Sequence, residues 1–176
     1  MENNFSRRFP DMVSTLRRHP QAYARIRGQD EYPSISGNVR FYQMQYSVLV
    51  VAQIMGLPDR NTPCDGPIYA FHIHEGGACE NSLCHGERCP QGNDPFADAG
   101  MHFNPYGCPH PYHAGDLPPL FGVNGMAFAA FLTDRFTVEE IIGRTVIIHG
   151  DVDDFMTQPS GNAGEKLACG LIVRNR

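Results

Sequence analysis

Apolar and polar side chains alternate along the chain after residue 21. Residues 22–27 and 35–44 alternate apolar or small side chains with polar ones, which is the period of a strand with one buried face. Residues 47–55 form a β-branched run that ends at Gly56-Leu57-Pro58, and such a run indicates a strand. These three segments therefore predict antiparallel strands joined by tight connections.

Further strand-like segments follow, with longer connections between them. They are residues 67–74, 125–132, 144–149 and 167–173. Thr137 and Glu140 have the spacing of a capping box, which predicts one helical turn between the second and third of these segments. Seven or eight short strands with long loops are typical of a β-sandwich or a Greek-key barrel, so the predicted fold class is all-β.

The first 20 residues have a different character. Arg7, Arg8, Arg17 and Arg18 make this segment basic, and few of its residues could form a core. A short helix over residues 11–18 is one alternative, a flexible tail is another, and an arm that binds polyanions or membranes is a third. The predicted organisation is a flexible basic N-terminal extension over residues 1–20, followed by a single β-barrel domain over residues 21–176.

Length and charge exclude several classes of protein. A chain of 176 residues can bury the core of one domain, and a formal net charge of −5 argues against a broad nucleic-acid-binding surface. No apolar run approaches the roughly 18–20 residues of a membrane span. No apolar stretch follows the N-terminal arginines, so no signal peptide is visible and a cytoplasmic location is expected. The six cysteines are also compatible with an oxidising, extracytoplasmic site.

The candidate chemistry lies in the histidines. His72 and His74 are two residues apart on a predicted strand, so both imidazoles lie on the same face. His102 and His149 complete a set of four imidazoles without a thiolate, which suits copper. A His-x-His pair accompanied by further histidines favours a metal site over isolated packed or solvent-facing side chains.

A second set lies in the loop of residues 101–116, which holds too many prolines and glycines for a regular helix or a central strand. His110, His113 and Asp116 are spaced three apart there. With His102 they offer three nitrogens and one oxygen, a ligand set typical of structural zinc. A solvated histidine-rich loop is the alternative.

Five segments in this order resemble the copper–zinc superoxide dismutase family. They are residues 71–75, 100–105, 113–117, 146–149 and 161–170. Each segment is weak alone, but five in family order across roughly residues 20–175 are specific. The resemblance implies an eight-stranded Greek-key β-barrel with long metal-binding loops and a site on its outer face. The gap from His110 to His113 is shorter than usual, which resembles a bacterial-type member with a shortened zinc loop.

The resemblance implies a role for each candidate ligand. His72, His74, His102 and His149 resemble the copper ligands; His102, His110, His113 and Asp116 resemble the zinc ligands, with His102 bridging both ions. Asp153 resembles the aspartate that hydrogen-bonds one histidine on each metal. Cys79 and Cys169 resemble the disulfide that ties the long loop to the barrel.

Two residues resemble the family's catalytic groups. His102 would give a proton to the nascent peroxide. Lys166, the only lysine in the chain, falls where the family has an arginine, and it keeps the positive charge but loses the planar pair of donors. The alternative is that Lys166 is a solvated surface charge beside Glu165.

Four cysteines fall outside the family pattern. They are Cys64, Cys84, Cys89 and Cys108. They could form disulfides in three ways, and sequence alone does not choose among them. A further metal site at Cys84, His85 and Cys89 is the alternative.

The implied activity is an antioxidant oxidoreductase reaction that disproportionates the superoxide anion to dioxygen and hydrogen peroxide, with copper and zinc as cofactors. One alternative is a copper-binding or copper-sequestering relative with little turnover, and another is a structural or surface protein. The expected partner is superoxide, without nucleic acid or a membrane span. Members of the family are often dimers, so a homodimer is an open expectation.

Overall fold

The computed structural model describes residues 13–58, 66–80 and 94–176. Its strands are β1 (Ala22–Gly28), β2 (Ser36–Gln43), β3 (Val48–Met55), β4 (Ile68–Tyr69), β5 (Phe71–His74), β6 (Leu120–Val123), β7 (Met126–Thr133), β8 (Thr145–His149) and β9 (Lys166–Arg174). Helical structure is confined, in the described residues, to a turn at residues 13–16, the 3₁₀ turn η1 (Ala97–Ala99) and α2 (Val138–Ile141). The predicted all-β class is confirmed.

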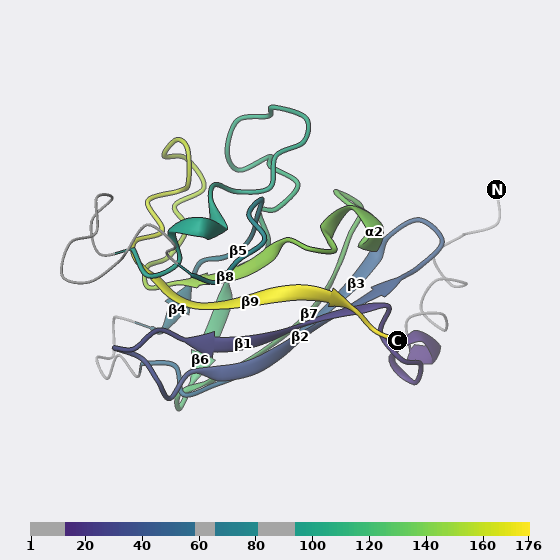
Figure 1. Cartoon of the computed structure of the whole chain (residues 1–176), viewed down its shortest axis with the longest axis horizontal. Coiled ribbons are helices and arrows are strands. Elements are labelled where there is room, and N and C mark those ends of the chain that lie inside the picture. The colour runs from purple at the N-terminus through teal and green to yellow at the C-terminus, as the bar shows by residue number, and fades with distance from the viewer. Residues whose placement is uncertain (1–12, 59–65, 81–93) are drawn as a thin grey trace.

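The strands form a nearly closed antiparallel barrel. The strand order is β4-β6-β7-β3-β2-β1-β9-β8-β5. β4 and β5 lie at opposite ends of this order, yet only Ala70 separates them in the chain, so one strand path joins the two edges (Figure 1). Counted as one strand, β4 and β5 give the eight strands that were predicted. The chain reaches β4 from β3 by passing β7 and β6, which is a Greek-key connection.

Two details of the sheet differ from the sequence prediction. The predicted fourth strand is interrupted at Ala70, whose N–H donates to the Asp151 carbonyl. The short strand β6 was not predicted, because Phe121 and Val123 point outward and so give no apolar–polar alternation. The predicted turn at Thr137 is present as α2, and the Thr137 N–H donates to the Glu140 carboxylate at 2.7 Å.

The core fills the inside of the barrel. Val39, Phe41, Val50 and Ile54 alternate along β2 and β3 and are almost completely buried in it. Because successive side chains of a strand point to opposite faces, the residues between them lie on the outside of the sheet. The alternation read from the sequence thus fixes which face is internal.

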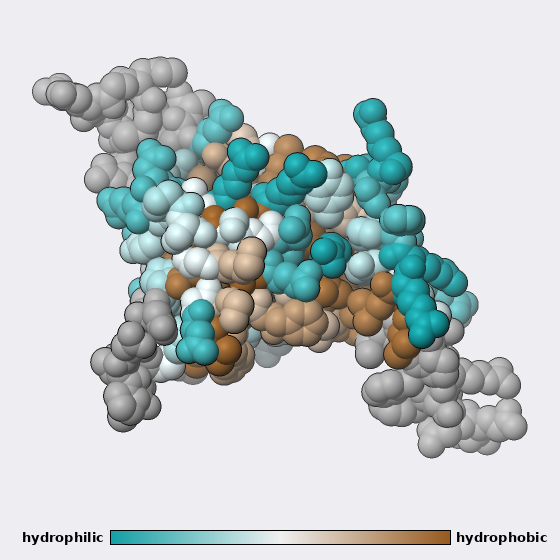
Figure 2. Space-filling view, turned by 90° about the horizontal axis from the view of Figure 1, so that it is seen from below, coloured by the Kyte–Doolittle hydropathy of each residue, from teal (hydrophilic) through white to brown (hydrophobic). Residues whose placement is uncertain are grey.

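One part of the outer surface is also apolar. Met55, Phe121, Val123, Met126 and Phe128 are each at least half exposed, and the register places Met55 and Val123 on either side of Met126. We call these five residues the apolar face. Figure 2 shows the barrel from below, where hydrophilic side chains occupy the middle of the view and hydrophobic ones gather along its lower margin.

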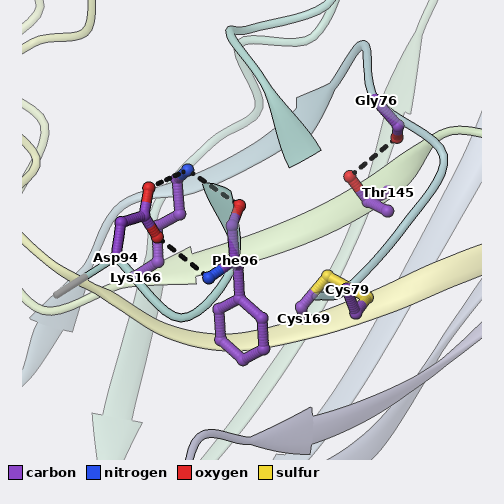
Figure 3. Close-up of a disulfide and its surroundings, with 7 residues drawn as sticks. All are labelled: Gly76, Cys79, Asp94, Phe96, Thr145, Lys166 and Cys169. Atoms are coloured by element: carbon purple, nitrogen blue, oxygen red, sulfur yellow. Dashed lines mark hydrogen bonds and ion pairs between the residues drawn. A yellow bond between two sulfur atoms is a disulfide. The ribbon is translucent and has the colours of Figure 1, made fainter. Parts of the chain in front are cut away.

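The two long loops stand on one side of the barrel, as Figure 1 shows for the loop before β6 and the loop between β8 and β9. The predicted disulfide between Cys79 and Cys169 is present, with sulfurs 2.05 Å apart, and it ties the loop after β5 to β9 (Figure 3). Cys108 is a free thiol in the described part of the chain. Cys64, Cys84, His85 and Cys89 lie outside the described residues, so their pairing or metal binding stays a prediction.

The N-terminal extension is described only from residue 13, so the division at residue 20 also stays a prediction. Within residues 13–58, 66–80 and 94–176, we find no helix of the length and apolar character that a membrane crossing requires.

Candidate metal centre

Strand β5 carries two of the candidate ligands on its outer face. Phe71 and Ile73 point into the core, and His72 and His74 point to the other side, where loop residues bury them. One edge of β5 pairs with β8. The other edge receives the histidine-rich loop through bridges from His72 to Asp116 and from His74 to His102.

Close backbone contact joins this loop to β5. The Ile73 N–H donates to the Gly115 carbonyl at 2.9 Å, and the Phe103 N–H donates to the Ile73 carbonyl at 2.8 Å. A Cβ atom at Gly115 would lie 2.2 Å from the Ile73 oxygen. Only glycine therefore lets the loop run against the strand and carry His102, His113 and Asp116 to the same place.

The structure brings together His72, His74, His102 and His149, whose ligand atoms lie within 4.8 Å of one another. We call them the first group. His74 Nδ1–H donates to the Gly100 carbonyl at 2.8 Å, so its Nε2 carries no proton. That Nε2 lies 3.2 Å from Nε2 of His149. Nitrogens bound to one tetrahedral zinc-like ion are about 3.3 Å apart, given bonds of about 2.0–2.1 Å, so this spacing fits an ion between them.

His102, His110, His113 and Asp116 form the second group, again with ligand atoms within 4.8 Å of one another. Asp116 is at its centre: Oδ1 lies 2.7 Å from His102 Nδ1, and Oδ2 lies 3.0 Å from His110 Nδ1. The group forms although the spacing between His110 and His113 is short. His102 belongs to both groups.

Three buried nitrogens of these groups have no hydrogen-bond partner among the residues that the structure describes. They are His72 Nδ1, His102 Nε2 and His110 Nδ1. The contact of His110 Nδ1 with Asp116 is an ion-pair distance without hydrogen-bond geometry. Unsatisfied buried polar atoms are rare and costly, and a cation bound to each group would satisfy all three. The donor sets, four imidazoles and three imidazoles with one carboxylate, fit copper and zinc.

Asp153 links the two groups. Its Oδ2 accepts from His72 Nε2–H and its Oδ1 from His110 Nε2–H, each at 2.8 Å. Burial opposes ionisation, but hydrogen bonds from His72, the Phe155 N–H and His110 lower the pKa of Asp153 to about 2. Gly161 has a φ of +67°, and a Cβ there would lie 2.0 Å from Asp153 Oδ1. This glycine leaves room for the link.

Burial also sets the protonation of the ligands. It lowers the pKa of His72 and His113, and it lowers the pKa of His74 and His149 well below the ordinary value of 6.5. Burial alone would raise the pKa of Asp116, but the hydrogen bond with His102 and the charges of nearby histidines lower it. Neutral imidazoles and an ionised carboxylate are the forms that bind a divalent ion.

Two residues that the sequence reasoning missed hold the second group's loop. Arg135, just after β7, donates from Nη1 to the carbonyls of Pro111, His113 and Asp116 at 3.0, 3.2 and 3.1 Å. The Gln158 side chain accepts from the His110 N–H at 2.9 Å and donates to the His110 carbonyl at 2.7 Å. No periodicity or spacing marks either residue, because each bonds to backbone atoms of a segment distant in the sequence.

Lys166 lies beside the first group. The register pairs it with His149, and a β-bulge between Ile148 and His149 produces this pairing. Cross-strand partners point to the same face of a sheet. The Lys166 ammonium is near enough for its charge to help lower the pKa of His74 and His149, after burial and the neighbouring histidines. Its side chain is 14% exposed and bonds to Asp94 and Phe96.

Comparison with known proteins gives one consistent result. The copper/zinc superoxide dismutase (SODC) family matches residues 35–172. The chain is 33% identical to a Cu-Zn superoxide dismutase of Legionella pneumophila over 80% of its own length and 79% of the relative's. It is 32% identical to the Cu-Zn superoxide dismutase of Photobacterium leiognathi over 77% and 78% of the two chains. It is 31% identical to the Cu-Zn superoxide dismutase of Deinococcus radiodurans over 81% of its own length and 80% of the relative's. The chain therefore belongs to the copper/zinc superoxide dismutase family.

Proposed function

We propose that this chain is a superoxide dismutase, an oxidoreductase that converts two superoxide anions and two protons into dioxygen and hydrogen peroxide. The first group would hold copper and the second group would hold zinc. The observation that carries the proposal is His102, whose Nδ1 contacts Asp116 of the second group while its buried Nε2 has no partner in the described structure and lies within the first group. One imidazole can thus serve two ions.

When bound, copper supplies the redox chemistry, because it can accept an electron from one superoxide and return it to the next. The protein supplies protons and orientation. His102 Nε2 is an unpaired acceptor at the first group, so it can take up a proton there and pass it to the peroxide product. Asp153 fixes the rings of His72 and His110 through their Nε2 atoms, which leaves Nδ1 of each ring toward an ion.

Attraction of the substrate needs a local positive charge, because the chain has a formal net charge of −5. Lys166 would provide this charge, and the pairing of Lys166 with His149 across the strands supports that role. A lysine ammonium attracts a small anion as a point charge, without the two-pronged geometry of arginine. We therefore propose His102 and Lys166 as the catalytic residues.

The test is superoxide consumption, followed by pulse radiolysis, on protein loaded with copper and zinc. His149→Ala removes a ligand of the first group only, so turnover should fall more than about 100-fold. His19→Ala is the matched control, because His19 is exposed and lies outside both groups. A loaded protein that consumes superoxide no faster than the copper buffer alone would contradict the enzyme and favour a copper-sequestering relative.

We also propose that the chain forms a homodimer through the apolar face. Large exposed apolar patches favour association, and this one spans neighbouring strands β3, β7 and β6. Sedimentation equilibrium should give a dimer at micromolar concentration, and Phe128→Glu should give a monomer with unchanged metal content. A wild-type chain that stays monomeric would contradict the dimer and leave the enzyme proposal untouched.

A further inference from the structure

The only lysine of the chain has a carboxylate partner. Lys166 Nζ donates to Asp94 Oδ2 at 2.7 Å and to the Phe96 carbonyl at 3.1 Å (Figure 3). An ammonium group has three N–H donors, and these two contacts use two of them. The charge proposed to attract superoxide is therefore already engaged by an anion of the protein.

The fold builds this pair from two directions. In a regular ladder, Leu167 would face His149; the bulge lets Leu167 enter the core and places Lys166 opposite His149 instead. A bulge next to a site commonly re-aims a side chain in this way. Lys166 is thus fixed at its backbone by β9, close to the first group.

The loop after β5 supplies the other half. Asp94 Oδ1 accepts from the Phe96 N–H at 2.9 Å, so the carboxylate is held by its own turn. Phe96 packs against Ala99, Ile147, Cys169 and Cys79, next to the disulfide that ties this loop to β9 (Figure 3). The carboxylate therefore has a defined place beside the ammonium.

We propose that Asp94 is a positioning and specificity residue that holds Lys166 beside the first group and competes with the incoming small anion for its ammonium. This inference rests on the function proposed above. The Asp94 side chain is 34% exposed against 14% for Lys166, so the carboxylate is the more solvated partner. Water can solvate the Asp94 carboxylate when it leaves the ammonium, so an anion can take its place. Attraction at the site is then lower than an unpaired lysine would give.

The experiment measures azide binding to the copper- and zinc-loaded protein through the azide–copper absorbance band, together with the rate constant for superoxide. Asp94→Asn removes the competing charge at nearly constant shape. Azide affinity should rise about threefold to tenfold at low ionic strength, as should the superoxide rate constant. Both gains should shrink near 1 M salt, where the Debye length is about 3 Å.

Glu165→Gln is the matched control. Glu165 is the residue before Lys166 and is acidic like Asp94, but its carboxylate accepts a hydrogen bond from the Tyr32 hydroxyl at 2.7 Å. It reports the effect of losing any nearby negative charge. The gain in azide affinity caused by Asp94→Asn must be larger than the gain caused by Glu165→Gln. This difference must vanish when Lys166→Gln is also present. If Asp94→Asn matches Glu165→Gln, lowers azide affinity, or keeps its excess without Lys166, the inference is wrong.

Asp94→Ser is a second variant in case the asparagine protein loses metal, because a serine hydroxyl can still accept from the Phe96 N–H. Asp94→Ser should also raise the azide affinity more than Glu165→Gln does. Azide binding also separates this inference from the proposed function. A wild-type protein without turnover contradicts the dismutase, whereas the azide comparison still tests Asp94.

Discussion

The two groups of candidate ligands share His102 but are built in different ways. Three members of the first group end or lie on strands, His72 and His74 on β5 and His149 on β8, so the ladder register sets their positions. The other members of the second group lie in the loop before β6, which is held by contacts to Arg135 and Gln158. The first group is therefore a property of the barrel, and the second depends on how well a loop is anchored.

Removing one ligand from each group tests whether the two groups form independently. His74→Ala should abolish copper binding and lower turnover more than about 100-fold, with zinc retained. His110→Ala should release zinc and leave copper bound, with a smaller loss of turnover. Metal analysis after dialysis, together with the superoxide assay, checks both variants. Loss of both metals in either variant would mean that the groups do not form independently.

Loss of the Asp153 carboxylate should affect both groups, because it bonds to one histidine of each. Asp153→Asn replaces one carboxylate oxygen by an NH2 group, which cannot accept from a histidine N–H, so either His72 or His110 loses its orienting partner. We expect the affinities for copper and zinc to fall about 10- to 100-fold. Chelator competition measures both affinities on one sample. Asp154→Asn is the control, because within the described residues its carboxylate accepts hydrogen bonds from its own turn alone. An effect of Asp153→Asn that is confined to one metal would contradict the link.

Acid should act on the metal-free protein chiefly through the strand histidines. The pKa of His74 and of His149 lies well below 6.5 in the folded chain, so the unfolded chain binds more protons as the pH falls below 6.5. The free energy of unfolding should then decrease by about 1.4 kcal/mol per pH unit for each such histidine. Asp153, with a folded pKa of about 2 against 3.8, adds a loss of the same sign between those values.

Urea unfolding of the metal-free protein at pH 7.5, 6.5 and 5.5 measures this slope. His74→Ala should reduce the slope by the contribution of one histidine, which is about 1.4 kcal/mol per pH unit. His19→Ala is the control and should leave the slope unchanged, because that side chain is exposed and lies outside both groups. Equal slopes in the wild type and His74→Ala would show that this histidine does not stay neutral in the folded protein.

Loss of the Arg135 side chain should affect the second group alone, and the expected effect is the smallest of those predicted. Arg135→Gln removes donors to the Pro111, His113 and Asp116 carbonyls. A loss of about 1 kcal/mol corresponds to zinc leaving about five times faster. Stopped-flow release to a chelator measures the rate, with copper release as the internal reference. Arg174→Gln is the control, because Arg174 pairs with exposed Glu139; an equal change in copper release would place Arg135 outside this role.

The sequence predicts the first group better than the second group's supports. Period-two alternation predicted β1 and β2, and apolar or β-branched segments predicted β3, β7, β8 and β9, all nearly at their observed bounds. The same rule placed His72 and His74 together on one face. It could not predict β6, whose outward residues are apolar, nor the break at Ala70, which depends on bonds to β8 and the following loop.

The residues that support the loops could not be predicted, because they bond to backbone atoms or are glycines that leave room for a neighbouring atom. Arg135 and Gln158 bond to main-chain groups of distant segments, and any residue there would offer the same carbonyl. Gly115 and Gly161 are required because neighbouring atoms lie where a Cβ would be. Asp94 precedes Phe96 in a stretch without periodicity, and only the folded loop brings it to Lys166. Such contacts are decided by the assembled fold.

The double attachment of Asp153 and the sharing of His102 have a thermodynamic consequence. An ion in one group orders a ligand and an orienting carboxylate that the other group also uses. The factor by which zinc changes the affinity for copper must equal the factor by which copper changes the affinity for zinc, because both routes reach the same loaded state. A variant that weakens this coupling would therefore change the affinity for the second ion by the same factor, whichever ion the cell supplies first.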